Sequence, residues 1–139
     1  MLVDAGAEIF GLDVLRRNGE DAAHTTTRFC LAARAPARHS PERPHLMTTF
    51  VFRVRNVPAA LYKALGGFAT NGVNMTKLES YMLDGHFTAT QFLCDVEGHP
   101  EQPKLRRALE ELEFFSRECR ILGVYPAAAL RLEQMDRGD

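Results

Sequence analysis

The segment from Met47 to Pro126 contains four runs rich in apolar, β-branched and aromatic residues, at 50–55, 73–81, 87–96 and 120–125. The first run alternates apolar with other side chains at a period of two, which predicts a half-buried strand. Asp84-Gly85 separates the second run from the third, and this dipeptide is typical of a two-residue hairpin. The pattern therefore predicts four strands, of which the second and third are antiparallel neighbours.

Apolar residues with helical spacing lie between these strands. One stripe runs from Ala60 to Phe68 and ends at Asn71-Gly72, and another occupies residues 103–115. The order strand, helix, strand, strand, helix, strand predicts an α+β, ferredoxin-like βαββαβ domain. Two helices cover only one face of such a sheet, so we expect the other face to meet water, a ligand or another subunit.

The chain before this domain has a different pattern. Residues 4–10 predict a helix that Gly11 ends. The short apolar runs Leu12–Leu15 and Thr27–Ala33 predict strands, and residues 16–24 between them predict turns, with Asn18-Gly19 as a turn dipeptide. This part reads as a short α/β segment.

Prolines at 36, 41 and 44 predict a linker, because they block both helices and central strands. At the other end, the charged tail from Leu130 is expected to fray. We therefore divide the chain into residues 1–35, a linker at 36–46, the βαββαβ domain at 47–127 and a tail at 128–139.

Composition and charge argue against several classes of protein. The net charge is −1, from 17 basic and 18 acidic residues, which argues against a nucleic-acid-binding protein. No apolar run is long enough for a membrane span, and the acidic N-terminus does not resemble a secretory signal. Three cysteines without a C-x-x-C pair suggest reduced, buried thiols and a cytoplasmic location. The five histidines are scattered, so we expect neither a metal nor another cofactor.

The first candidate binding segment is 56–61, where a strand passes into a helix. Backbone N–H groups and the helix dipole at such a junction favour a carboxylate. The alternative is a plain helix cap in which Asn56 satisfies the first turn and Pro58 preorganises it.

A second candidate segment is 71–80. Gly72 permits a turn with positive φ, after which the Asn74 amide is able to contact an amino or carboxylate group. An asparagine that caps its own turn is an equally good interpretation. Glu79-Ser80 suits either a binding groove or a solvated strand edge.

The third candidate is the run Thr25–Phe29. Arginine binds carboxylates in a bidentate manner, and the hydroxyl of Thr27 is a possible proton donor if the surrounding site stabilises the charge. On composition alone, a strand that begins with a surface arginine is the simpler interpretation.

Taken together, these segments resemble the prephenate dehydratase family. Four stretches of this chain resemble the regulatory ACT domain of that family: PAAL at 58–61, GVNMTKLES at 72–80, FLCDVEGH at 92–99 and ILGVYP at 121–126. Two further stretches resemble the end of its catalytic domain: AGAEIFGL at 5–12 and TTTRF at 25–29. The resemblance covers nearly all of the chain except the linker and the tail.

The resemblance implies a role for each motif. Prephenate loses water and carbon dioxide to give phenylpyruvate, on the route to L-phenylalanine. Thr27 would protonate the leaving hydroxyl, Arg28 would hold a carboxylate and Phe29 would pack beneath the substrate. L-phenylalanine would bind the ACT domain as a feedback inhibitor, at a homodimer interface, through Asn56, Ala59, Ala60, Leu61, Asn74, Met75, Thr76, Glu79 and Ser80.

Three departures from the family pattern change these expectations. Ala59 replaces a glycine, Tyr81-Met82 replaces Arg-Pro, and most of the catalytic domain is missing from the sequence. We therefore expect a C-terminal piece that senses L-phenylalanine but is inactive alone. A stand-alone amino-acid-binding module is the alternative, and an RNA-binding ferredoxin-like domain is disfavoured by the charge and the lack of a basic-aromatic pattern.

Overall fold

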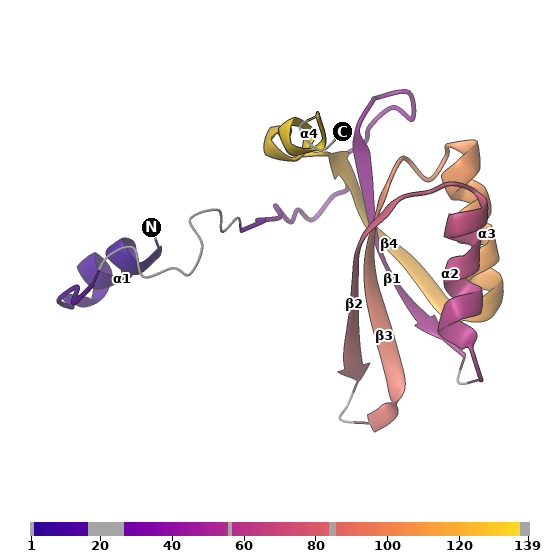
Figure 1. The fold of residues 1–139 in the computed structure, drawn as a ribbon, viewed down its shortest axis with the longest axis horizontal. Helices are drawn as coiled ribbons and strands as arrows, with labels where there is room; N and C mark the ends of the chain where they lie inside the picture. The colour runs from indigo at the N-terminus through magenta and orange to yellow at the C-terminus, as the bar shows by residue number, and fades with distance from the viewer. Residues whose placement is uncertain (1, 17–26, 56, 84–85, 137–139) are drawn as a thin grey trace. The chain divides into compact units, whose positions relative to one another are not determined.

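The computed structural model describes residues 2–16, 27–55, 57–83 and 86–136 (Figure 1). The chain divides into two compact units, Met1–Ala33 and Arg34–Asp139.

The second unit has the predicted βαββαβ order. Its elements are β1 (Leu46–Val54), α2 (Ala60–Thr70), β2 (Met75–Leu83), β3 (His86–Glu97), α3 (Pro103–Phe115) and β4 (Ser116–Pro126), followed by α4 (Ala129–Asp136). The strand order is β2-β3-β1-β4, and all neighbours are antiparallel. Figure 1 shows α2 and α3 together on one face of the sheet. The predicted α+β, ferredoxin-like fold is confirmed.

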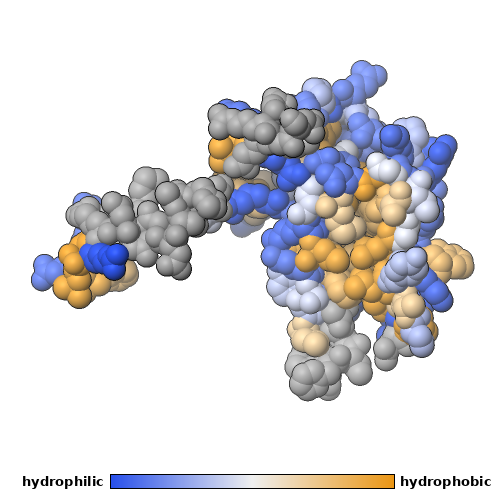
Figure 2. All heavy atoms as spheres, in the orientation of Figure 1, coloured by the Kyte–Doolittle hydropathy of each residue, from blue (hydrophilic) through white to orange (hydrophobic). Residues whose placement is uncertain are grey.

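Aromatic side chains form the centre of the core between the sheet and the two helices. Phe50 of β1 stacks on Phe68 of α2, with 5.8 Å between ring centroids, and Phe52 stacks on Phe92 of β3 at 5.2 Å. The helix α3 contributes the stripe predicted from its spacing, which is buried at Leu105, Ala108, Leu109 and Leu112. In Figure 2, apolar residues are visible between the helical layer and the sheet, with hydrophilic residues around them.

Hydrogen bonds organise the opposite face of the sheet. Side chains alternate along a strand, so Thr49 and Asp95 point away from the core that their neighbours Phe50 and Cys94 enter. The Thr49 hydroxyl donates to the Asp95 carboxylate at 2.5 Å and lies 2.8 Å from the Tyr125 hydroxyl. Asp95 is nevertheless fully buried.

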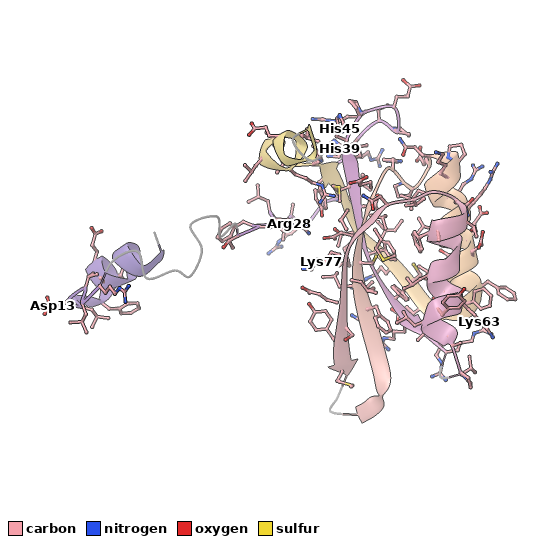
Figure 3. All side chains as sticks on the ribbon, in the orientation of Figure 1. Asp13, Arg28, His39, His45, Lys63 and Lys77 are labelled. Atoms are coloured by element: carbon pink, nitrogen blue, oxygen red, sulfur yellow. The ribbon has the colours of Figure 1, made fainter. Side chains whose placement is uncertain are left out.

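Within the tail, residues 129–136 form the helix α4, which the sequence analysis did not predict. An ion pair of 2.8 Å joins Arg131 of α4 to Glu97 at the end of β3, and the Ala127 N–H donates to the His45 carbonyl just before β1. The segment that leads into β1 and the helix α4 lie at the same end of the sheet, where Figure 3 labels His39 and His45.

In the first unit, α1 (Leu2–Phe10) ends at Gly11 as predicted. Gly11 has a φ of 60°, and the Leu12 N–H reaches back to the Ala7 carbonyl, the closing bond of a Schellman motif. The strands predicted at Leu12–Leu15 and Thr27–Ala33 are wrong, since both runs lack regular structure. A strand needs a hydrogen-bonded neighbour, and no described residue pairs with either run.

One cysteine prediction is also wrong. Cys30 lies in the irregular run after residue 26 and is exposed, whereas Cys94 is buried and Cys119 is half-buried. The predicted turns at 17–24, which include Asn18-Gly19, lie outside the described residues.

Candidate functional site

The junction between β1 and α2 has an unusual backbone. Ala59, the N-cap residue of α2, has a φ of 58° and a ψ of 21°, which is the left-handed region that favours glycine. Among the described residues no side chain caps the helix, and the Ala60 N–H donates to the Val57 carbonyl at 3.1 Å. The N–H groups of Leu61 and Tyr62, which have no intrahelical acceptor, therefore stay available to a ligand or to water. Asn56, the cap predicted from the sequence, lies outside the described residues.

The residues next to Ala59 differ in exposure. Ala60 is buried at 7% exposure, and Leu61 is half-buried against the core. Val57 and Tyr62 are exposed on either side of them. A group that approached the first turn of α2 from solvent would therefore meet backbone N–H groups in partly apolar surroundings.

The turn that follows α2 contains the second predicted segment. Gly72 has a φ of 63°, as the sequence predicted, and the Val73 N–H closes the turn onto the Phe68 carbonyl. Asn74 is exposed, and its carbonyl accepts the Glu97 N–H at 3.0 Å. Its side-chain amide makes no hydrogen bond to the described part of the chain, so it is free to contact a ligand.

Met75 and Thr76 have structural contacts of their own. Met75 packs against the hydrophobic core, and the Thr76 hydroxyl donates to the Asp95 carbonyl at 3.3 Å. Their side chains are therefore less available to a ligand than that of Asn74.

On β2, Glu79 is held by its neighbours. The Tyr81 hydroxyl donates to its carboxylate at 2.5 Å, and the Lys77 ammonium pairs with the other oxygen at 3.0 Å. The hydrogen bond to Glu79, followed by desolvation and the charge of Glu79, raises the pKa of Tyr81. Ser80, on the other face of the strand, is exposed. Glu79 is thus a fixed, solvent-facing carboxylate.

The structure does not bring all the predicted ligand residues together. Ala59 to Leu61 lie at the start of α2, and Asn74 to Thr76 follow its end, roughly 15 Å away at 1.5 Å per residue. Figure 3 labels Lys63, on the first turn of α2, and Lys77, on β2, in different parts of the domain. Within one chain the predicted ligand residues therefore form two separate groups.

The Thr-Arg-Phe motif lies in the first unit. Thr27, Arg28 and Phe29 are all exposed and have no regular structure, and the Phe29 side chain is 78% exposed. Thr25 and Thr26 lie outside the described residues.

The sequence reasoning missed a cavity of about 290 Å³ in the second unit. Glu97 and Arg131 line it together with the segment that enters β1. The two residues are 34 positions apart, and only their separate positions near element ends could have drawn attention to them.

Among residues 2–16, 27–55, 57–83 and 86–136, no three His, Cys, Asp or Glu side chains gather where they would hold a metal ion. None of the helices in the described part of the chain is long and apolar enough to cross a membrane.

Three known proteins illustrate what this chain is similar to. A bifunctional N-acyl-homoserine lactone acylase/prephenate dehydratase from Komagataeibacter europaeus is 66% identical over 125 residues, covering 90% of this chain and 44% of that protein. The solved structure of the quorum-quenching acylase GqqA is 67% identical, with a TM-score of 0.65, and covers 71% of this chain and 51% of that one.

The third is a prephenate dehydratase from Arthrobacter aurescens, solved in complex with L-Phe. It is 29% identical with a TM-score of 0.57, and covers 68% of this chain and 30% of that one. No family model matches the sequence. The chain spans less than half the length of the curated relatives that it matches.

Proposed function

Because the chain is homologous to the C-terminal portion of prephenate dehydratases, we propose that residues 47–127 form an ACT domain that binds L-phenylalanine as an effector. The observation that carries this proposal is the βαββαβ fold shared with a prephenate dehydratase solved with L-Phe. The proposal assigns the chain a sensing role in aromatic amino acid biosynthesis.

Two half-sites supply complementary chemistry for a zwitterion. The first turn of α2 after Ala59, where the N–H groups of Leu61 and Tyr62 have no intrahelical acceptor, suits the α-carboxylate, because N–H groups and the helix dipole both favour an anion. The fixed carboxylate of Glu79 and the free amide of Asn74 suit the α-ammonium. The phenyl ring would lie against Leu61 and its apolar neighbours.

The separation of these half-sites supports a homodimer. About 15 Å along α2 is too far for one amino acid to reach both ends. Two copies, with the first turn of α2 in one facing β2 of its partner, would complete two equivalent sites. Binding would then stabilise the dimer and transmit a signal to any attached catalytic unit as a coupling between sites.

A catalytic role is proposed only for the Thr-Arg-Phe motif, as part of a larger catalytic domain. Thr27, Arg28 and Phe29 would serve prephenate dehydration as proton donor, carboxylate ligand and packing residue, and residues 1–35 would be part of a catalytic domain. Their exposure supports the need for further residues around them, since a threonine donates a proton well only in a site that excludes water. We therefore expect this chain alone to form no phenylpyruvate from prephenate.

A stand-alone amino-acid-binding module is the alternative for the same fold. It would bind L-phenylalanine equally well and would restore no dehydratase activity when mixed with an upstream catalytic segment of a relative. Restored activity in that mixture would favour the role as part of the enzyme.

The 66% identity to a bifunctional acylase/dehydratase favours a second candidate function. The chain would then be the C-terminal part of a protein that also hydrolyses N-acyl-homoserine lactones. Release of fatty acid from such a lactone by the purified chain would support this candidate. If the chain binds L-phenylalanine but releases no fatty acid, the acylase activity is excluded for the chain alone.

Variants of one half-site test the proposal. Glu79→Gln keeps the size of the side chain and removes the charge that would meet the ammonium group, so it should weaken L-phenylalanine binding about tenfold or more. Glu110→Gln, on the exposed face of α3, is the matched control and should leave affinity unchanged. Equal affinities for both variants and the parent chain would remove Glu79 from the site.

A further inference from the structure

Three polar side chains follow one another along one face of the edge strand β2. Lys77, Glu79 and Tyr81 occupy alternate positions, so their side chains leave the strand on the same side, where Figure 3 labels Lys77. Leu78, between the first two, lies opposite Cys94 of the core, which places the three polar residues on the face away from α2 and α3. The side chains of Lys77 and Glu79 are 34% and 45% exposed, so a ligand from solvent can reach both.

The carboxylate of Glu79 has a donor on each of its oxygens. The Tyr81 hydroxyl donates to Oε2 at 2.5 Å, and the Lys77 Nζ lies 3.0 Å from Oε1. The hydroxyl is neutral, and its hydrogen bond to Glu79 is the main reason that the pKa of Tyr81 is raised, so it remains a donor at neutral pH. Tyr81 therefore holds the carboxylate in place and leaves its negative charge intact.

Lys77, in contrast, cancels that charge. A lysine ammonium group carries three N–H donors on a compact positive charge, which is also the chemistry of the α-ammonium group of an amino acid. An amino acid that brings its ammonium group to Oε1 of Glu79 therefore meets a place that a group of the same kind already occupies. Two cations on one carboxylate repel each other, so the second gains less than it would gain alone.

The ion pair between Lys77 and Glu79 is weak enough to be opened. Pairs between solvent-exposed side chains contribute little to stability, because the attraction is small in water and the flexible lysine loses conformational freedom. A ligand whose ring and carboxylate make contacts elsewhere can therefore displace the lysine, whereas a simple amine lacks those contacts.

We propose that Lys77 is an affinity-determining residue of the site at Glu79: its ammonium group occupies the place that the α-ammonium group of the ligand takes, and binding displaces it. The inference rests on the proposed function, because it takes L-phenylalanine as the ligand of this site. The chain then binds L-phenylalanine less tightly than Glu79 alone would permit, and Lys77 sets the concentration of amino acid at which the site fills.

Calorimetric titration of the full chain with L-phenylalanine tests this role. Lys77→Met keeps the apolar stem and removes the charge, and it should tighten binding about two- to fivefold, the range that exposed ion pairs span. Lys104→Met replaces an exposed lysine in the first turn of α3, and this matched control should leave the affinity unchanged. 3-Phenylpropanoate lacks the ammonium group, so Lys77→Met should not tighten its binding.

A double variant separates displacement from a general effect of charge. If Lys77 acts by occupying Glu79, Lys77→Met should give no gain in affinity once Glu79→Gln is also present. A gain of the same size with and without Glu79→Gln would mean that Lys77 repels the ligand from a distance, and it would overturn the proposal.

The outcomes also distinguish this inference from the proposed function. If the parent chain binds L-phenylalanine and Lys77→Met leaves the affinity unchanged, the role of Lys77 is rejected while the sensing role stands. An affinity that falls on Lys77→Met rejects it too, and makes Lys77 a partner of the ligand carboxylate. Absence of saturable binding by the parent chain and by every variant would reject the proposed function and this inference with it.

Discussion

Gly67 of α2 lies so close to Glu111 of α3 that a Cβ atom at position 67 would be 2.9 Å from the Glu111 Cβ and 2.8 Å from its carboxylate. The side-chain amide of Asn71, the residue that caps the end of α2, donates to the same carboxylate at 3.1 Å. The two helices that cover the sheet are therefore in contact at a point where only glycine fits.

This contact predicts opposite effects for two adjacent glycines. Gly67→Ala should destabilise the domain by about 1–3 kcal/mol, because the helices must separate. Gly66→Ala has open space around its new Cβ and should stabilise it by about 0.5–1 kcal/mol through helix propensity. Urea denaturation of both variants measures the difference, and equal changes of the same sign would refute the packing argument.

The left-handed conformation of Ala59 predicts a stabilising substitution. Ala59→Gly should raise the free energy of unfolding by up to about 1 kcal/mol, because it removes the Cβ that strains this backbone. Ala60→Gly, one residue later in helical conformation, is the control and should destabilise the domain. Thermal denaturation distinguishes the two, and a loss of stability on Ala59→Gly would contradict the observed φ.

The hydrogen bond from Thr49 to the buried Asp95 predicts a cost for its removal. Thr49→Val keeps the β-branched shape but leaves the carboxylate without this donor, so stability should fall by about 1–3 kcal/mol. The Thr70 hydroxyl donates to helix carbonyls near the surface and accepts from the Asn71 amide, so Thr70→Val should change stability by less. Chemical denaturation gives both values, and a neutral Thr49→Val would show that the bond contributes little.

The thiols predict a difference in reactivity and an alkaline effect on stability. Burial raises the pKa of Cys94 to about 12 and that of Cys119 to about 11. At pH 8 a thiol reagent should therefore modify exposed Cys30 first and leave the other two intact until the protein unfolds. Rapid labelling of all three in the folded protein would contradict their burial.

The same pKa of Cys94 fixes the sign of the pH effect. Between the ordinary value of 9.0 and about 12, the unfolded chain loses the thiol proton while the folded chain keeps it. The stability that this thiol contributes is thus complete below pH 9 and declines as the pH rises toward 12. Cys94→Val should make the alkaline decline in unfolding free energy shallower than in the parent chain.

Much of the domain could be predicted from local patterns, because its elements follow their periodicity closely. The stripe of α3 begins and ends where the sequence indicated, at Pro103 and Phe115. The strand β4 is longer than predicted, since residues 116–119 are largely polar and extend it by backbone pairing with β1 at the sheet edge. Because this pairing uses backbone hydrogen bonds, it leaves no alternation of apolar side chains from which the longer strand could be predicted.

The parts that could not be predicted depend on tertiary partners. The runs at 12–15 and 27–33 have strand-like composition but no described neighbour to pair with, and the tail becomes helical where Arg131 reaches Glu97. The candidate site shows the same limit. The sequence indicates Ala59 and Glu79 separately, whereas their separation within one protomer appears only in the fold.

Calorimetric titration of the purified chain with L-phenylalanine, combined with its mass in solution, is the most direct test of the sensing role. We predict saturable binding by a dimer, with one ligand per protomer. A folded chain that produces no heat of binding up to the solubility limit of phenylalanine would contradict it.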